Sequence, residues 1–357
     1  MPKVHNYSAG PCILPQEVLQ KASEAVVNFN DLNLSLLEIS HRSKDFVEVM
    51  ENARSLVKEL LEVPEGYQVL FLQGGASLGF LIAAYNFLPM GEKAAYINTG
   101  TWAANSIKEA QRVGDIVEVA SSKDKNYSYI PTGFGIPNDA KYLHFTSNNT
   151  ICGTQFKQTP ISRIPIICDM SSDIFSKKIK VSDYDLIYAG AQKNMGPAGT
   201  TVYIVKESAL GKTGNNIPAM LDLQTHIKKD SMFNTPPVYP IYVSMLNLQW
   251  LKKNGGVDWI EKINNQKADL LYNEIDRNSL FEGVTAVASR SNMNATFVLK
   301  DENLTEEFNK AWTAANISGI KGHRSVGGYR ASMYNALPLE SVQVLVDVMK
   351  ELEISKG

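Results

Sequence analysis

Cysteine is scarce in this chain of 357 residues, which holds only Cys12, Cys152 and Cys168. No two of them have the close CxxC spacing of a zinc or redox motif, so the sequence predicts neither a metal site nor a disulfide framework. An odd and sparse set of cysteines is typical of a cytoplasmic protein whose thiols stay reduced.

Long apolar runs are also missing. The longest, around residues 80–85, is far shorter than the roughly 20 residues that a membrane-spanning helix needs. The first residues, MPKVHNYSAGPCILP, hold no continuous apolar stretch of the kind found in signal peptides. We therefore expect no membrane association.

An excess of charge is absent too, because 35 Lys and Arg face 37 Asp and Glu. This balance gives no electrostatic reason to expect nucleic acid as a partner. Any site for an anion must be a local cluster of cations.

Short apolar runs alternate with helical stretches over residues 16–258. Runs such as PIICD (165–169) and DLIYAG (185–190) are apolar on both faces, as are strands of a parallel sheet covered by helices. The other expected strands are VLFLQ (69–73), AAYIN (94–98), IVEVA (116–120), YLHFTSN (142–148) and TVYIV (201–205). We expect an α/β fold, with a large, mostly parallel α/β/α domain over residues 16–258.

The remaining residues, 1–15 together with 259–357, are expected to form a smaller α+β domain. A helix over 239–253 and a long amphipathic helix over 257–276 lead into it. Further along we expect strands at TAVAS (285–289) and ATFVLK (295–300), and helices over 304–316 and from Leu339 onward.

A lysine among small residues is the strongest local signal for chemistry. Lys193 follows an expected strand within AGAQKNMGPAG (189–199), where small side chains let the backbone and a cofactor approach closely. Exposed loop lysines are common, and acids after strands often only cap a turn. However, Asp169 and Lys193 follow two successive strands, and ligands of open α/β sheets bind beyond such strand ends. Pyridoxal phosphate (PLP) needs this pair, because a lysine amine bonds its aldehyde and a carboxylate keeps its ring nitrogen protonated.

The motif QGGASLGF (73–80) stands between an expected strand and an expected helix. Gly74 and Gly75 permit a tight turn, and the amides of Ala76 and Ser77 open the helix, where a phosphate binds free N–H groups. The motif lacks the residues of a P-loop or a dinucleotide site. Trp102 opens the next expected helix, where it either stacks on a cofactor ring or packs in the core.

Two His-Arg pairs stand out in a chain with five histidines: His41-Arg42 in SHRSKDF and His323-Arg324 in GHRSVGG. Both lie in segments rich in Gly or Ser that can surround an anion, although solvated loop charges are the ordinary alternative. Arg330 follows in the same apolar-flanked segment and is suited to a bidentate pair with a carboxylate.

Taken together, these motifs resemble the phosphoserine aminotransferase family over nearly the whole chain. The matching segments are SAGP (8–11), SHRSKDF (40–46), QGGAS (73–77), TGTW (99–102), NNTICGTQF (148–156), CDMSSD (168–173), AGAQKNMGPAG (189–199), FNTPP (233–237) and GHRSVGGYRASMYNA (322–336). The resemblance implies a fold-type I, PLP-dependent homodimer with active sites at the subunit interface. It also implies a ping-pong reaction that interconverts glutamate and 3-phosphohydroxypyruvate with 2-oxoglutarate and phosphoserine, as in serine biosynthesis.

The same resemblance implies a role for each cofactor residue. Lys193 bonds the cofactor and moves the proton at the substrate Cα, Asp169 pairs with the ring nitrogen, and Trp102 stacks on the ring. The remaining cofactor contacts are Gly75, Ala76 and Gln192 at the phosphate, Asn234 and Thr235 at the phosphate from the neighbouring subunit, and Thr150 at the ring oxygen. Asn149 is a departure, because the family usually has an acid before this threonine.

Substrate contacts follow from the resemblance in the same way. Arg330 binds the α-carboxylate that both substrates share. The distal anion binds a cluster, partly across the dimer interface, that consists of His41, Arg42, His323 and Arg324.

Several alternatives stay open at this point. Another class V enzyme is one, but a cysteine desulfurase typically stacks His where this chain has Trp102, and an alanine–glyoxylate aminotransferase needs no second cation cluster. A non-catalytic PLP-binding protein would have no use for Arg330. A nucleotide-binding module that uses GGAS lacks the expected Lys-Ser/Thr. Use of a second phosphorylated substrate, from vitamin B6 synthesis, also stays open.

Overall fold

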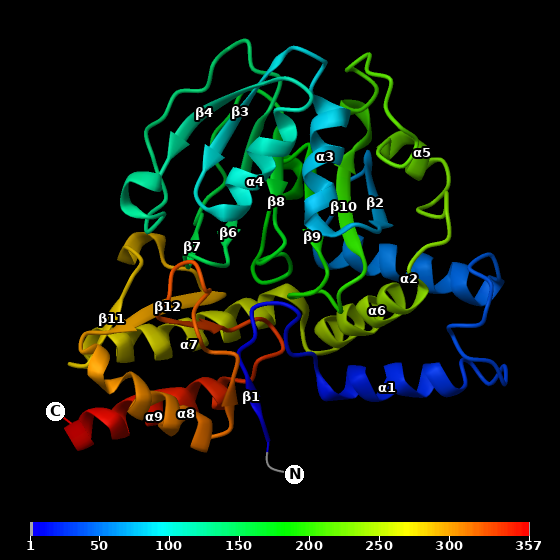
Figure 1. The fold of residues 1–357 in the computed structure, drawn as a ribbon. Coiled ribbons are helices and arrows are strands. Elements are labelled where there is room, and N and C mark those ends of the chain that lie inside the picture. Colours follow the sequence, from blue (N-terminus) through cyan, green and yellow to red (C-terminus); the bar gives the residue numbers. More distant parts are fainter. Residues whose placement is uncertain (1–2, 357) are drawn as a thin grey trace.

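The computed structural model describes residues 3–356 and shows a large sheet between helices, with a smaller helix-and-sheet unit beneath it (Figure 1). The helices are α1 (Gln16–Val27), α2 (Lys44–Leu60), α3 (Gly75–Phe87), α4 (Thr101–Ala110), α5 (Leu223–Ile227), α6 (Val238–Lys253), α7 (Gly256–Arg277), α8 (Thr305–Ala314) and α9 (Leu339–Lys356). The strands are β1 (His5–Asn6), β2 (Tyr67–Leu72), β3 (Lys93–Asn98), β4 (Asp115–Ser121), β5 (Leu143–Thr146), β6 (Asn148–Asn149), β7 (Thr154–Gln155), β8 (Ile166–Asp169), β9 (Leu186–Gly190), β10 (Thr201–Lys206), β11 (Phe281–Gly283), β12 (Asn294–Leu299), β13 (Ile317–Ser318) and β14 (Tyr329–Ser332).

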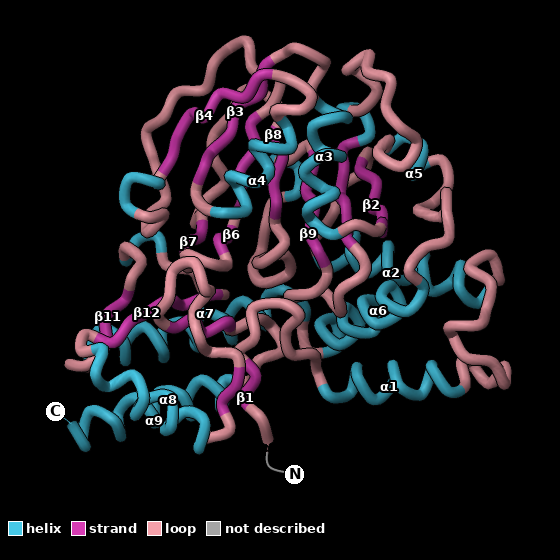
Figure 2. Tube along the Cα trace, viewed as in Figure 1, coloured by secondary structure: helices cyan, strands magenta, loops and turns pink. Residues whose placement is uncertain are grey.

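The large sheet has seven strands in the order β2-β10-β9-β8-β5-β3-β4. Only β10 runs antiparallel to its neighbours in this sheet, and the remaining pairs are parallel. Successive strand residues alternate between two buried faces: Phe71 and Phe145 pack with α1, α2 and α6, whereas Leu70 and Tyr188 pack with α3 and α4. Figure 2 shows the strands of this sheet with helices on its two sides. The predicted α/β fold class, with a mostly parallel sheet, is confirmed.

The pairing of β8 with β9 places the chemistry. The two strands run parallel, with Asp169 opposite Tyr188, so their carboxyl ends meet at one edge of the sheet. Asp169 is the last residue of β8, and Lys193 stands in the turn that follows β9. Strand direction alone therefore brings the two side chains to the same edge.

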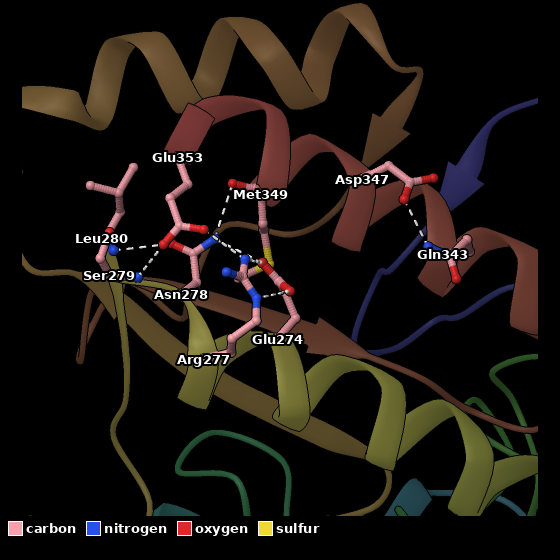
Figure 3. A network of polar contacts seen from close by, with 9 residues as sticks. All are labelled: Glu274, Arg277, Asn278, Ser279, Leu280, Gln343, Asp347, Met349 and Glu353. Atoms are coloured by element: carbon pink, nitrogen blue, oxygen red, sulfur yellow. Dashed lines mark hydrogen bonds and ion pairs between the residues drawn. The ribbon is translucent and has the colours of Figure 1, made fainter. Parts of the chain in front are cut away.

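The smaller unit has its own apolar core, built by α7, α8, α9 and the antiparallel sheet β11-β12-β14. Figure 3 shows how the end of α7 is tied to α9: Asn278 Nδ2 donates to Glu274 Oε1 at 2.8 Å and to the Met349 carbonyl at 3.1 Å. Arg277 bridges Glu274 and Glu353, an ion-pair network at the surface of this unit. The domain boundaries at 15/16 and 258/259 stay a prediction. No helix within residues 3–356 combines the length and the apolar character that crossing a membrane requires.

The strand predicted at TAVAS (285–289) is wrong. The strand of this region is β11, at Phe281–Gly283, and residues 287–289 form a short 3-10 turn instead. The reason is a competing set of hydrogen bonds, because the Ala286 amide donates to the Ser128 carbonyl and the Ser289 hydroxyl accepts from the Ile130 amide. The expected strand over 142–148 is interrupted at Ser147, which separates β5 from β6.

A close approach of α3 to the sheet yields the first prediction. Gly79 faces the fully buried ring of Tyr188, and a Cβ at position 79 would lie 2.7 Å from Tyr188 Cδ2. Alanine favours a helix over glycine by about 1 kcal/mol. Overpacking against a ring with no room to move costs about 1–3 kcal/mol, so we predict that Gly79→Ala lowers the free energy of unfolding. Urea unfolding measures the change. Gly135→Ala is the control, since a Cβ there meets nothing within 4 Å; equal midpoints for the two variants would contradict the packing.

Candidate active site

A cavity of about 380 Å³ opens at the edge of the sheet where β8 and β9 end. It brings together residues from the large sheet, from α3 and α4, and from β14 of the smaller sheet. The predicted residues that line it are Gly75, Ala76, Trp102, Thr150, Asp169, Gln192, Lys193, His323 and Arg330. Residues more than 250 positions apart in the sequence thus share one wall.

Lys193 lies in this cavity with its amine held in place. Its Nζ donates to Thr150 Oγ1 at 2.7 Å. Burial lowers the pKa of Lys193 to about 8; the Asp169 carboxylate opposes this shift, and the Arg330 guanidinium adds to it. The amine is therefore neutral for much of the time under mildly alkaline conditions, as a proton-transferring lysine must be.

Asp169 is almost fully buried and is anchored through one oxygen. The amide and the hydroxyl of Ser171 both donate to Asp169 Oδ1, at 3.0 and 2.6 Å. Within residues 3–356, no hydrogen bond ends on Oδ2, so this oxygen is left for a ligand. Burial raises the pKa of Asp169, while the bonds from Ser171 and the charge of Lys193 lower it. Sequence reasoning did not single out Ser171, although a serine two residues after an acid is a known turn signal.

The first turn of α3 is built to bind an anion. Gly74 has a φ of 98°, and a Cβ on it would lie 2.5 Å from Leu78 Cδ2, so the turn into the helix requires glycine at this position. The first turn carries no acidic side chain. Its free amides at Gly75 and Ala76 line the cavity, where the helix dipole favours a negative group.

Arg330 lies on β14 and is 9% exposed. Its Nη1 donates to the Thr150 carbonyl at 3.4 Å, and its buried Nε has no partner among the described residues. No acidic side chain within residues 3–356 forms an ion pair with it. A guanidinium in such surroundings is suited to bind a carboxylate from outside the protein.

His323 lines the same cavity from the loop before β14. Burial lowers the pKa of His323, and the charges of Arg330 and Arg324 lower it further. Both effects favour the neutral form of the ring, and an anion bound beside these cations would oppose them.

Five predicted residues do not line the cavity of their own chain: His41, Arg42, Asn234, Thr235 and Arg324. Figure 1 shows the loop between α1 and α2, which carries His41 and Arg42, at the right-hand edge of the molecule, away from the end of β9. The Thr235 carbonyl accepts from Gln73 Nε2 at the surface. The roles of these five residues stay predictions.

Comparison with known proteins agrees with this geometry. The model of the family described as Aminotransferase class-V matches residues 4–345. The phosphoserine aminotransferase of Flavobacterium psychrophilum is 66% identical over 352 residues, which cover 98% of this chain and 99% of that protein. The chain belongs to the phosphoserine aminotransferases of class V.

Two solved structures show the same fold. The phosphoserine aminotransferase from Bacillus circulans subsp. alkalophilus has a TM-score of 0.96 and 43% identity, with 99% of each chain covered. The PLP-bound phosphoserine aminotransferase from Trichomonas vaginalis has a TM-score of 0.92 and 34% identity, with 98% of this chain and 100% of that chain covered. The resemblance predicted from the motifs is confirmed.

One feature of this aminotransferase departs from the pattern predicted for its family. Asn149 is buried and donates to Thr99 Oγ1 at 3.1 Å and to Thr154 Oγ1 at 3.0 Å. Its amide thereby joins the end of β3 to the loop that carries Thr150, using a donor that a carboxylate lacks. The cavity is also lined by Ser172, Thr146 and Asn148, which the sequence analysis did not predict as site residues. Each is a small polar residue near a strand end, and no sequence motif distinguishes it from other such residues.

The surroundings of Lys193 yield the second prediction, measured as the rate at which cofactor-free protein captures the PLP aldehyde. Because capture needs the neutral amine, the rate should rise with pH and level off above the pKa of about 8. Arg330→Gln removes a cation and should move this midpoint to higher pH, whereas Asp169→Asn removes an anion and should move it to lower pH. Shifts of the same sign in both variants would contradict the electrostatics described above.

Proposed function

We propose that this protein transfers the amino group of glutamate to 3-phosphohydroxypyruvate, giving 2-oxoglutarate and O-phospho-L-serine, with PLP as its cofactor. One observation carries the proposal: Lys193, Asp169 and Arg330 share a single cavity, and Arg330 has no acidic partner among residues 3–356. An amine for the cofactor and a guanidinium for an amino-acid carboxylate are the minimum that an aminotransferase site requires.

The residues of the cavity fit this cofactor. The free amides of α3, with Gln192 beside them, suit its phosphate, and Asp169 Oδ2 suits its ring nitrogen. Trp102, 37% exposed at the cavity wall, offers a flat apolar face for the ring. Once bound, PLP supplies an electron sink that stabilises negative charge at the substrate Cα.

Lys193 is the residue that transfers the proton in the proposed reaction. With a pKa of about 8, its amine accepts the Cα proton and returns it without a large energy difference between its two forms. The Thr150 hydroxyl, which accepts a hydrogen bond from Nζ, directs the amine. The cation of Arg330 fixes the α-carboxylate and so holds the Cα near Nζ.

The two amino-acid substrates differ only at their far end, where one carries a carboxylate and the other a phosphate dianion. The cluster of His41, Arg42, His323 and Arg324 is proposed to bind both. His323 supports this, because it lines the cavity and a dianion bound beside Arg330 and Arg324 would oppose the charges that lower its pKa. Two arginines supply the fixed charge.

A desulfurase is disfavoured by the thiols. Burial raises the pKa of Cys12 to about 12 and that of Cys152 to about 11, and Cys168 is fully buried with its pKa raised as well. None of the three is a ready thiolate nucleophile. These free cysteines also support a reducing compartment, so we propose that the enzyme lies in the cytoplasm. The proposed reaction itself belongs to serine biosynthesis.

The active form is proposed to be a homodimer in which each site takes residues from both subunits. Exposed apolar side chains gather on the segments that would meet the partner. They are Leu19, Val27, Leu32, Leu34 and Leu37 around α1 and the loop before His41, and Phe233 beside Asn234. Apolar groups exposed close to polar groups assigned to a site are typical of an interface.

The third prediction tests the function. Purified enzyme should show an absorbance band near the visible edge that bleaches with glutamate and returns with 3-phosphohydroxypyruvate but not with pyruvate. Lys193→Ala should keep PLP without reacting in either direction. Recovery of the band with pyruvate alone would point to another class V aminotransferase. The phosphorylated precursor from vitamin B6 synthesis, tested alongside, shows whether a second substrate is accepted.

The fourth prediction tests the shared sites. Lys193→Ala and Arg42→Ala homodimers should each be nearly inactive with phosphoserine. If Arg42 serves the partner's site, mixed dimers contain one site with both residues intact, and activity should return to about one quarter of the wild-type value after random reassociation. If Arg42 serves its own chain, no mixed dimer has an intact site, and mixing restores nothing.

A further inference from the structure

Lys193 and Arg330 come from different sheets. Lys193 follows β9 of the seven-stranded sheet, whereas Arg330 lies on β14 of the three-stranded sheet. A substrate held by its amine and its α-carboxylate must span the gap between them. Because a misplacement of roughly 1 Å can cost about 10²-fold in rate, whatever fixes this gap matters for catalysis.

Asn194, next to Lys193 in the chain, is buried and uses both ends of its amide. Its Nδ2 donates to the Ile174 carbonyl at 3.1 Å, and its Oδ1 accepts from the backbone N–H of Asn335 at 3.0 Å. Asn247 of α6 holds the same loop, since its Nδ2 donates to the Asn194 carbonyl at 2.9 Å and to the Met195 carbonyl at 3.0 Å. The lysine loop is thus tied to the chain beyond Arg330.

Asn335 completes the connection from the other side. It is buried, its Nδ2 donates to the Phe175 carbonyl at 3.0 Å, and its Oδ1 accepts from Asn264 Nδ2 of α7 at 2.9 Å. Phe175 belongs to the turn that follows Asp169 and has a φ of 60°, an unusual conformation for a large side chain. The bond from Asn335 helps to hold this turn.

A fully buried lysine holds the same segment from α7. Lys267 Nζ donates to the carbonyls of Met333, Tyr334 and Leu337, at 3.0, 2.9 and 3.1 Å. The segment that begins three residues after Arg330 therefore has few alternative positions.

We propose that Asn194 and Asn335 are positioning residues that set the spacing between Lys193 and Arg330. With this spacing, a substrate whose α-carboxylate binds Arg330 has its Cα within reach of Lys193, so the rate depends on the α-carboxylate. The proposal rests on the proposed role of Arg330. Each of these asparagines bridges two groups as donor and acceptor without burying a charge, which neither a carboxylate nor an apolar side chain can do. The bridge joins the elements that carry Lys193, Asp169 and Arg330.

The test compares glutamate with its decarboxylated counterpart, 4-aminobutyrate, which has the amine but no α-carboxylate. Single-turnover absorbance gives the ratio of the two rates for PLP-loaded enzyme. We expect Asn335→Ala to lower this ratio about 10- to 100-fold, because only the α-carboxylate reports the spacing. Loss of rate with both substrates in equal proportion would overturn the proposal.

Asn278→Ala is the matched control. Asn278 is equally buried, and it makes hydrogen bonds within the smaller unit only (Figure 3). This variant should lose stability while keeping the wild-type ratio. Asn335→Ala removes the side-chain bonds to Phe175 and Asn264 but keeps the backbone amide that bonds Asn194 Oδ1. Hydrogen exchange of the apoprotein, followed by mass spectrometry, should therefore rise over residues 170–176 in Asn335→Ala but not in Asn278→Ala; unchanged exchange over 170–176 would also contradict the bridge.

A double-mutant cycle separates this inference from the proposed function. If Arg330 does not bind the α-carboxylate, Arg330→Gln alone leaves the ratio unchanged, and the proposed role of Arg330 fails. If it does, adding Asn335→Ala to Arg330→Gln should cause no further fall in the ratio, whereas independent, additive losses would refute positioning.

Should Asn335→Ala not fold, Asn335→Asp replaces it. Its protonated form keeps a donor toward Phe175, so the ratio should recover as the pH is lowered, and a ratio independent of pH would count against the bridge.

Discussion

The chemistry proposed for this enzyme depends on the burial of one amine, that of Lys193, away from water. Burial makes the charged form of Lys193 costly, Asp169 partly restores it, and Arg330 opposes it again, which leaves a pKa of about 8. A lysine on the surface would stay protonated, and a lysine with an ion-pair partner would be held in its charged form. Neither applies in the cavity. Asp169 bonds Ser171 and forms no ion pair with Lys193, and the charge of Arg330 is not neutralised by an acidic side chain within residues 3–356, so it still lowers the pKa of Lys193.

This electrostatic balance requires three side chains from distant parts of the chain to be placed accurately. Parallel pairing of β8 and β9 solves the first part, since it brings Asp169 and the lysine loop to one edge of the sheet. The second part, the approach of β14, is not a matter of strand pairing, because β14 belongs to another sheet. The buried side-chain amides of Asn194 and Asn335 connect the lysine loop to the chain beyond β14. Directional hydrogen bonds fix the relative position of these segments more tightly than apolar packing alone.

Much of this arrangement could be predicted from the sequence, for physical reasons. Short runs that are apolar on both faces indicate buried strands, and a glycine pair between a strand and a helix indicates a helix N-terminus that can bind an anion. Lys193 and Asp169 could be found because each follows such a strand. The strand at 285–289 was predicted wrongly because the Ala286 amide bonds the Ser128 carbonyl and the Ser289 hydroxyl bonds the Ile130 amide, tertiary contacts that no local pattern reports. Ser171 and Asn335 were not predicted for a related reason. Their roles come from their tertiary hydrogen bonds, and serine and asparagine are common at positions without such roles.

The place of the N-terminal segment has a consequence for how the chain is made. β1 pairs with β13, and the Tyr7 hydroxyl donates to the Ser341 carbonyl in the core of the smaller unit. Residues 5–7 are thus bonded to residues more than 300 positions later in the sequence. The large sheet holds all of its strands by residue 206 and can assemble during translation, whereas the wall formed by Ala9 and Gly10 has to wait for the C-terminal helix. A complete cavity therefore requires the smaller unit to be folded, and a chain cut before α9 would have the sheet without a finished site.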